Sequence, residues 1–264
     1  MKLMNNLLLM MLLTFLGISS LMAREYFEGF DSPGKPPTRD GIHWGYADEL
    51  TPVEGWKDII PGDGYAHLCV NATTLGRKAS KETPFPFQTL SFGPVAPSHR
   101  ISMRAKNTAI PGVACSLFIY RDRSGVDEID IEIVSEDTRS GEAGHPTVGE
   151  EGWSDLRLNT WADALEGKDG VLSPSRSIRQ PIRDTAGKRI SHRDGKFHTY
   201  TIEWRSDSVT FYIDDVVQGV IRDVIPKAPS QVIIGMRRMP WAGKVDWSGQ
   251  ETMLIDWVDI EELK

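Results

Sequence analysis

The chain has 264 residues and a formal net charge of −7, with 30 basic and 37 acidic side chains. This acidic balance argues against nucleic acid as the natural partner, because binding a phosphate backbone requires a basic surface. The length suits one large domain or two small ones, and all-β sandwiches often reach this size as a single domain.

The first 23 residues have the layout of a secretory signal peptide, with a charge at Lys2, an apolar run and small residues ending at Ala23. The apolar run over residues 7–18 is shorter than the ~20 residues that span a bilayer. We therefore predict cleavage of residues 1–23 and a single domain over residues 24–264. We also predict no membrane span after cleavage, and a secreted or periplasmic location.

The two cysteines, Cys69 and Cys115, leave two alternatives open. In an exported protein they could form a disulfide. Both lie in apolar, strand-like stretches, where free buried cysteines are equally common.

Along the chain, short runs of alternating apolar and polar residues are separated by turn residues, and long helical patterns are almost absent. This pattern predicts a β-sandwich or barrel. The expected strands cover residues 98–105, 114–121, 126–134, 154–161, 197–204, 208–215, 216–221, 231–238 and 253–262. Residues 31–41 and 135–153 are predicted loops, and the second is either a functional loop or a plain insertion.

The run from Val126 to Ile133 alternates strictly, so Glu128, Asp130 and Glu132 are predicted to share one face of a strand. Acidic residues are poor strand formers, and three on one face repel one another. Three interpretations remain open: a solvated face, a calcium site, or glycoside cleavage. In the last, one carboxylate attacks the anomeric carbon and one carboxylic acid protonates the leaving oxygen.

This acidic segment resembles the active-site strand of glycoside hydrolase family 16, whose pattern is E-x-D-x-E or E-x-D-x-x-E. Other segments resemble the same family in the same order, so the similarity covers roughly residues 27–262. They are FEGFD (27–31), RISMRAKNTAIPGVACSLFIY (100–120), FHTYTIEWRSDSVTFYIDDVVQ (197–218) and MLIDWVDIEE (253–262).

The resemblance implies an all-β, concanavalin-like jelly-roll sandwich of two antiparallel sheets with a concave substrate cleft. Glu128 would be the nucleophile, Glu132 the general acid/base, and Asp130 the residue that tunes the nucleophile. The expected activity is retaining, endo-acting hydrolysis of a β-linked polysaccharide, with β-glucan of lichenan or laminarin type favoured and no cofactor for catalysis. A transglycosylase and a non-catalytic carbohydrate-binding module are the alternatives.

Three residues of the run over 154–161 alternate as well: Arg157, Asn159 and Trp161. They resemble positions that line the sugar sites in the family, and Trp161 would stack on a sugar ring. Trp241 resembles another cleft position. For both tryptophans, core packing is the competing interpretation, because tryptophan is usually largely buried.

This chain departs from the family pattern at Arg100, Arg157 and Arg237, where the family has other residues. Guanidinium groups match sulfate and carboxylate groups. The arginines therefore raise a second substrate hypothesis, a sulfated galactan of agar, porphyran or carrageenan type. The alternative is that they pair with nearby carboxylates.

The resemblance also implies a structural calcium ion, with Asp256 at the matching position. The expected partner is the polysaccharide alone, and we expect a monomer.

Overall fold

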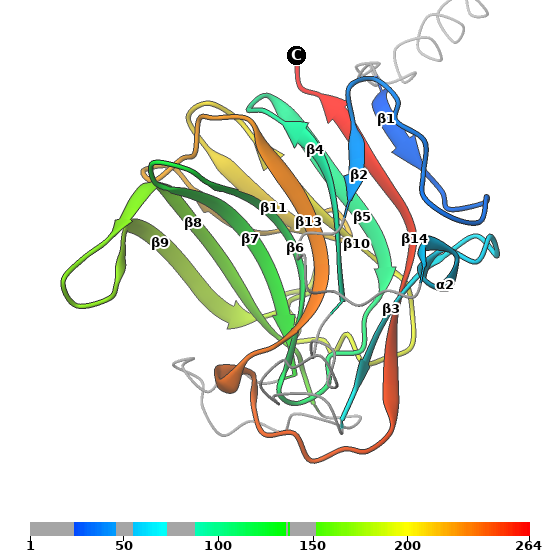
Figure 1. The fold of residues 1–264 in the computed structure, drawn as a ribbon. Coiled ribbons are helices and arrows are strands. Elements are labelled where there is room, and N and C mark those ends of the chain that lie inside the picture. The colour runs from blue at the N-terminus through cyan, green and yellow to red at the C-terminus, as the bar shows by residue number, and fades with distance from the viewer. Residues whose placement is uncertain (1–23, 46–54, 73–87, 136, 138–151) are drawn as a thin grey trace, which may run out of the picture.

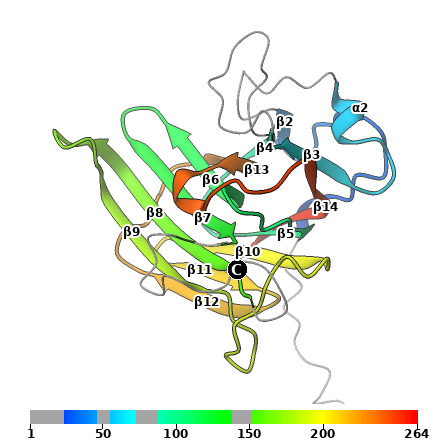
Figure 2. The same ribbon diagram turned by 90° about the horizontal axis from the view of Figure 1, so that it is seen from below.

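The computed structural model describes residues 24–45, 55–72, 88–135, 137 and 152–264. The predicted signal peptide and most of the predicted loop over 135–153 lie outside these ranges. Two antiparallel sheets are layered face to face (Figures 1 and 2). Sheet I has the order β1-β14-β5-β10-β11-β12, with β3 also paired to β14, and sheet II has the order β2-β4-β13-β6-β7-β8-β9. The predicted all-β sandwich is thus confirmed.

The strands of sheet I are β1 (Arg24–Glu28), β3 (Ala66–Asn71), β5 (His99–Lys106), β10 (His198–Trp204), β11 (Val209–Ile213), β12 (Val216–Ile221) and β14 (Gln250–Glu262). The strands of sheet II are β2 (His43–Gly45), β4 (Gln88–Val95), β6 (Val113–Asp122), β7 (Val126–Val134), β8 (Asp155–Glu166), β9 (Leu172–Pro181) and β13 (Ser230–Arg238). The helical elements among the described residues are α2 (Trp56–Ile59) and the 3₁₀ turn η1 (Pro240–Ala242). None of the described helices is long and apolar enough to cross a membrane.

The core lies between the two sheets and fixes the register of β7. Ile129, Ile131 and Ile133 are completely buried and belong to the same hydrophobic cluster as Tyr200 and Ile202 of β10. Full burial of one such aliphatic side chain contributes about 1.5–3 kcal/mol. A slip of one residue would expose all three isoleucines and turn the acidic residues into the core, so the acidic face of β7 must point outward.

The predicted hairpins of sheet I are confirmed. Strand β10 pairs with β11, with Trp204 opposite Val209. Strand β11 then turns into β12 through Asp214 and Asp215, whose φ angles are 49° and 62°. A two-residue turn with both central residues in the left-handed region suits the natural twist of a hairpin, and aspartate tolerates that region better than most residues.

Strand β9 was not among the predicted strands. It reads LSPSRSIRQP, with two prolines, and most of its side chains are exposed. It forms the edge of sheet II, where a strand needs hydrogen bonds on one side only and accepts proline. The alternating apolar pattern that identifies inner strands is therefore missing here.

Both cysteines are free thiols, so they are not joined. Cys69 lies on β3 with its sulfur 3.2 Å from the hydroxyl of Thr252, and Cys115 is buried on β6 with its sulfur 3.5 Å from the hydroxyl of Thr108. Of the two alternatives from the sequence, the disulfide is wrong.

Candidate active site

The three acidic residues of β7 open into one pocket of about 540 Å³ on the outer face of sheet II. Asp130 and Glu132 are 2% and 4% exposed. The other lining residues come from β8, β9, β13, the β8–β9 turn and η1. They are Arg157, Asn159, Trp161, Gly170, Val171, Leu172, Ser175, Arg176, Ser177, Arg179, Arg237, Met239 and Trp241. The pocket thus brings together five of the six predicted substrate-binding residues and the three predicted catalytic ones.

Strand pairing places the predicted β8 residues directly opposite the acidic ones. Trp161 lies opposite Glu128, Asn159 opposite Asp130 and Arg157 opposite Glu132. The side-chain amide of Asn159 donates to Asp130 Oδ2 at 3.1 Å and to Glu132 Oε2 at 3.2 Å.

Ser177 of β9 holds this amide in position. Its hydroxyl donates to the Oδ1 of Asn159 at 2.7 Å. With the oxygen of the amide occupied, its NH₂ group faces the two carboxyls. Asn159 therefore links Asp130 and Glu132 through hydrogen bonds to both carboxyls.

Burial shapes the electrostatics of the triad. It raises the pKa of Glu132 to about 8, with the charge of Asp130 adding to the rise and Arg237, Arg157 and Asn159 opposing it. Burial also raises the pKa of Glu128 to about 7, where Arg237 and a hydrogen bond with Asp130 oppose the rise. Burial therefore favours the protonated form of both outer carboxyls, well above the pH at which a glutamate in water ionises.

Asp130 lies between them. Burial raises its pKa well above the usual range, and the charge of Glu128 raises it further. One strand face thus presents three carboxyls with raised pKa values, and a carboxylate beside a carboxylic acid is the pair that acid-assisted displacement at a sugar carbon requires.

Two of the predicted arginines in the pocket pair with carboxylates. Arg157 donates twice to Asp137, at 2.7 and 2.9 Å, and its guanidinium lies 3.5 Å from the centre of the Trp241 ring. Arg237 lies 3.7 Å from Glu132. The interpretation that arginines pair with nearby carboxylates is therefore confirmed for these two.

Arg100 does not belong to this site. It lies on β5 of sheet I, pairs with Asp215 at 3.3 Å and covers the ring of Tyr212. The sequence resemblance aligned it with a cleft position, but its strand pairs with β10 and β14 in the opposite layer. The structure therefore does not bring Arg100 to the acidic pocket with the other predicted substrate-binding residues.

A second pocket, of about 620 Å³, opens on the same sheet and was missed by the sequence reasoning. Tyr120 of β6 lines it and lies directly opposite Glu128. The second pocket is the larger, but the carboxyl triad lies only in the first, so we assign the chemistry there. The alternation of residues 114–121 put Tyr120 on one face, but only the pairing of β6 with β7 shows which face it is.

The prediction of calcium at Asp256 does not fit the residues around it. The carboxylate of Asp256 pairs with the guanidinium of Arg104, which also lies over the ring of Phe197 at 4.9 Å. A cation already accompanies this carboxylate, and a calcium ion needs six to eight oxygen ligands. We derive no role for calcium in this site.

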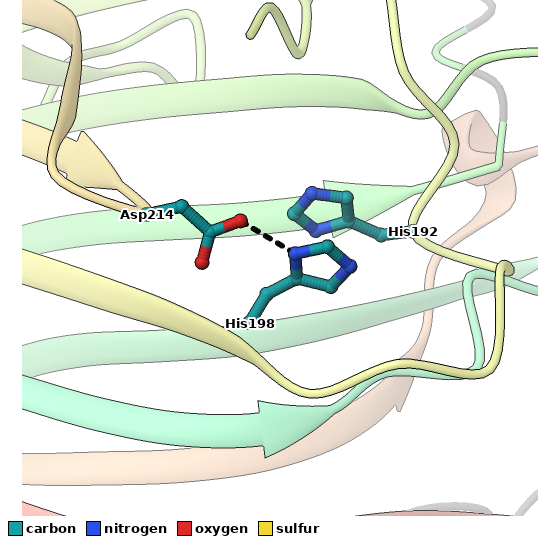
Figure 3. Close-up of side chains that lie close together, drawn as sticks. All are labelled: His192, His198 and Asp214. Carbon is teal, nitrogen blue, oxygen red and sulfur yellow. Dashed lines mark hydrogen bonds and ion pairs between the residues drawn. The ribbon is translucent and has the colours of Figure 1, made fainter.

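Among the described residues, one group brings three potential metal ligands close together: His192, His198 and Asp214, with ligand atoms within 4.8 Å of one another. Figure 3 shows His192 lying over His198 while Asp214 approaches His198 from the side. The two rings are stacked, with centres 3.9 Å apart and planes 8° from parallel.

This geometry opposes metal binding. The nitrogen lone pairs of parallel stacked rings run side by side and do not converge on one ion. Both ring nitrogens of His198 also pair with carboxylates, at 2.6 Å with Asp214 and 3.2 Å with Asp194. The group joins His198, the first residue of β10, to His192 of the preceding loop and Asp214 of the β11–β12 turn, and it lies outside the lining of the acidic pocket.

Comparisons with known proteins show what this chain is similar to. The family profile of the glycosyl hydrolases of family 16 matches residues 88–259. A beta-glucanase of Paenibacillus macerans is 26% identical over 57% of this chain and 51% of its own length. A beta-glucanase of Brevibacillus brevis is 25% identical over 86% of this chain and 75% of its own length. The match thus spans about half of the first relative.

Among solved structures, a beta-1,3-1,4-glucanase (lichenase) derived from a mouse hindgut metagenome superposes with a TM-score of 0.62 at 18% identity. The superposition covers 90% of this chain and 99% of that chain. At this identity the likeness speaks for the fold alone.

Proposed function

Because this chain belongs to the glycosyl hydrolases of family 16, we propose that it is a retaining, endo-acting hydrolase of a β-linked polysaccharide. The favoured substrate is a β-glucan of lichenan or laminarin type, as the names of the relatives suggest. One observation carries the proposal: Glu128, Asp130 and Glu132 share a strand face and open into one pocket, where burial raises the pKa of each carboxyl.

In the first step Glu132, whose pKa burial raises to about 8, donates its proton to the glycosidic oxygen. The carboxylate of Glu128 attacks the anomeric carbon, the bond to the leaving oxygen breaks, and a glycosyl-enzyme ester forms. Asp130 lies between the two glutamates on the same strand face, and its role in the proposal is to tune the nucleophile. Asn159 orients Asp130 and Glu132 through its amide.

In the second step Glu132 is a carboxylate and takes a proton from water. The resulting attack on the anomeric carbon releases Glu128, and two inversions give net retention of configuration. If a sugar hydroxyl takes the place of water, the same step yields transglycosylation, which the length of the products distinguishes from hydrolysis.

A sulfated galactan remains the second candidate substrate, because four arginines line the pocket: Arg157, Arg176, Arg179 and Arg237. Arg157 pairs with Asp137 and Arg176 pairs with Asp223, which counts against a sulfated substrate, because carboxylates already neutralise these two charges. We therefore rank this candidate below a neutral β-glucan.

The test is the release of reducing ends by residues 24–264 from mixed-linkage β-glucan, laminarin, xyloglucan, agarose, porphyran and carrageenans. Glu128→Gln should lower the rate about a thousandfold, because it removes the nucleophile from a set of groups that act together. Glu262→Gln, at an exposed position on β14, is the matched control and should keep the parent rate.

Release from a sulfated galactan alone would replace the β-glucan by the second candidate. Sugar binding without release by parent and variant alike would favour the non-catalytic binding module.

A further inference from the structure

Arg237 reaches the acidic strand β7 from β13, across the intervening strand β6. Gly235 of β13 lies opposite Ser116 of β6, and Ser116 lies opposite Glu132 of β7. These two small residues leave space above β6 for the side chain of Arg237, which starts two residues further along β13. Its Nη2 lies 3.7 Å from Oε1 of Glu132.

An aromatic ring holds this guanidinium in place. Its central carbon lies 4.7 Å from the centre of the Phe118 ring, a distance at which a cation is attracted to the ring face. Phe118 in turn lies opposite Asp130. The side chain of Arg237 is 27% exposed. Arg237 is therefore fixed over the row of carboxyls and is not a loose surface side chain.

The arginine on the other side of Glu132 is arranged differently. Arg157 donates twice to Asp137, so a carboxylate outside the triad accompanies its charge. The contact of Arg237 is with Glu132 itself, at 3.7 Å. Its Nε is buried and has no acceptor among the described residues, so the described protein groups do not use the whole guanidinium.

We propose that Arg237 is a positioning residue of this active site, which holds the carboxyl of Glu132 in place and sets the pH range in which the triad works. This inference rests on the proposed function. The titratable and polar groups around Glu132 are Glu128 and Asp130 on β7, Arg157 and Asn159 on β8, Ser116 on β6 and Arg237 on β13, while Tyr120 of β6 lies opposite Glu128.

The charge of Arg237 acts on all three carboxyls. Burial raises the pKa of Glu128, Asp130 and Glu132, and Arg237 lowers it at each of them. A positive charge favours the ionised form of a nearby carboxyl, so its removal raises the pKa. Without Arg237, a higher pH is needed to ionise Glu128, and Glu132 keeps its proton to a higher pH.

The experiment compares the parent with Arg237→Met, Arg237→Lys and Arg238→Met. The profile of kcat/KM against pH reports the ionisation of groups in the free enzyme. Arg237→Met should move both limbs of the profile upward by about one pH unit. Arg237→Lys restores the charge and should return the profile toward that of the parent. Arg238→Met removes an exposed charge from the same strand and should leave the profile unchanged.

A second readout does not depend on activity. Carbon-13 NMR of protein labelled at its glutamate carboxyls, with Glu132→Gln for assignment, should show a raised pKa of Glu132 in Arg237→Met. If the parent cleaves no polysaccharide, the proposed function fails, and this titration still decides the role of Arg237. An unchanged titration and pH profile, with a higher KM alone, would overturn the proposal and make Arg237 a substrate contact.

Discussion

At the scale of the residue, the burial of Glu132 links reactivity to instability. Burial keeps the proton on this carboxyl near neutral pH, which suits a general acid, but ionising it inside the protein costs free energy. The folded pKa of about 8 lies above the ordinary glutamate value of 4.5. The unfolded chain therefore loses its proton first as pH rises, and folding stability falls between these two pH values.

We expect Glu132→Gln to abolish activity and to stabilise the protein at high pH. The amide cannot ionise, so the free energy of unfolding should rise on the order of 2 kcal/mol at pH 8. At pH 4.5 the gain should nearly vanish, because the parent carboxyl is protonated when folded. Thermal unfolding at the two pH values measures the difference. An equal gain in unfolding free energy at both pH values would mean that ionisation of Glu132 is not what destabilises the parent.

At the scale of the element, a network around Asp127 joins the start of β7 to a bend in β8. Asp127 is 2% exposed and accepts hydrogen bonds from Arg121, at 3.0 and 2.5 Å, and from the backbone N–H of Asp163, at 2.9 Å. The register between β8 and β9 shifts between Trp161 and Leu165. The register between β7 and β8 shifts between Val126 and Glu128. This bend aims the end of the β8–β9 hairpin, which lines the acidic pocket.

Replacing Asp127 by Asn should weaken this bend. It leaves Arg121 without its buried partner charge and should cost about 3 kcal/mol in the free energy of unfolding, measured by denaturant titration. The kcat/KM should fall as well, because the displaced wall lines the same pocket as Glu128.

Asp163→Asn is the matched control. The side chain of Asp163 is 81% exposed, and its contact with Arg121 is longer, at 3.4 Å. It should change stability by less than about 0.5 kcal/mol. A similar loss in both variants would show that Asp127 has no special role in the bend.

The sequence predicted the inner elements of the fold and not its edges. Strand β7 could be predicted because its isoleucines and carboxylates alternate without a break, and a buried strand with one polar face requires that pattern. Strand β9 could not, because an edge strand tolerates proline and exposed polar residues.

Contacts across strands were also beyond the sequence. The alternation of β8 placed Arg157 and Asn159 on one face, but the partner of each depends on register. Only the three-dimensional structure shows that Arg157 pairs with Asp137 and that Arg100 lies in sheet I.

At the scale of the whole molecule, His192 and Glu132 make the folding stability depend on pH in opposite directions. Burial lowers the pKa of His192 from 6.5 to about 3. Burial also lowers the pKa of His198, but the hydrogen bonds and charges of Asp214 and Asp194 together outweigh it, so the pKa of His198 is raised overall. The unfolded chain therefore binds a proton at His192 before the folded protein does, and stability contributed by this residue falls as pH drops from 6.5 toward 3.

His192→Phe should reduce this loss of stability in acid. The free energy of unfolding of the parent should fall relative to the variant by up to about 1.4 kcal/mol per pH unit in that range. The variant also removes the hydrogen bond between His192 and Tyr200, which lowers stability equally at every pH. The slope against pH therefore separates the two effects in denaturant titrations at pH 4, 5, 6 and 7, and identical slopes would contradict the assignment of the proton.

The exposed edge strand β9 has a consequence for the behaviour of the protein in concentrated solution. An open strand edge can recruit a second chain and start a growing fibre, and proline and charged side chains oppose this. Strand β9 carries Pro174 and Pro181, which have no N–H to offer, together with Arg176 and Arg179. The same two arginines line the acidic pocket. Neutralising them to change substrate choice would also remove a barrier against self-association, so engineered specificity here carries a solubility risk.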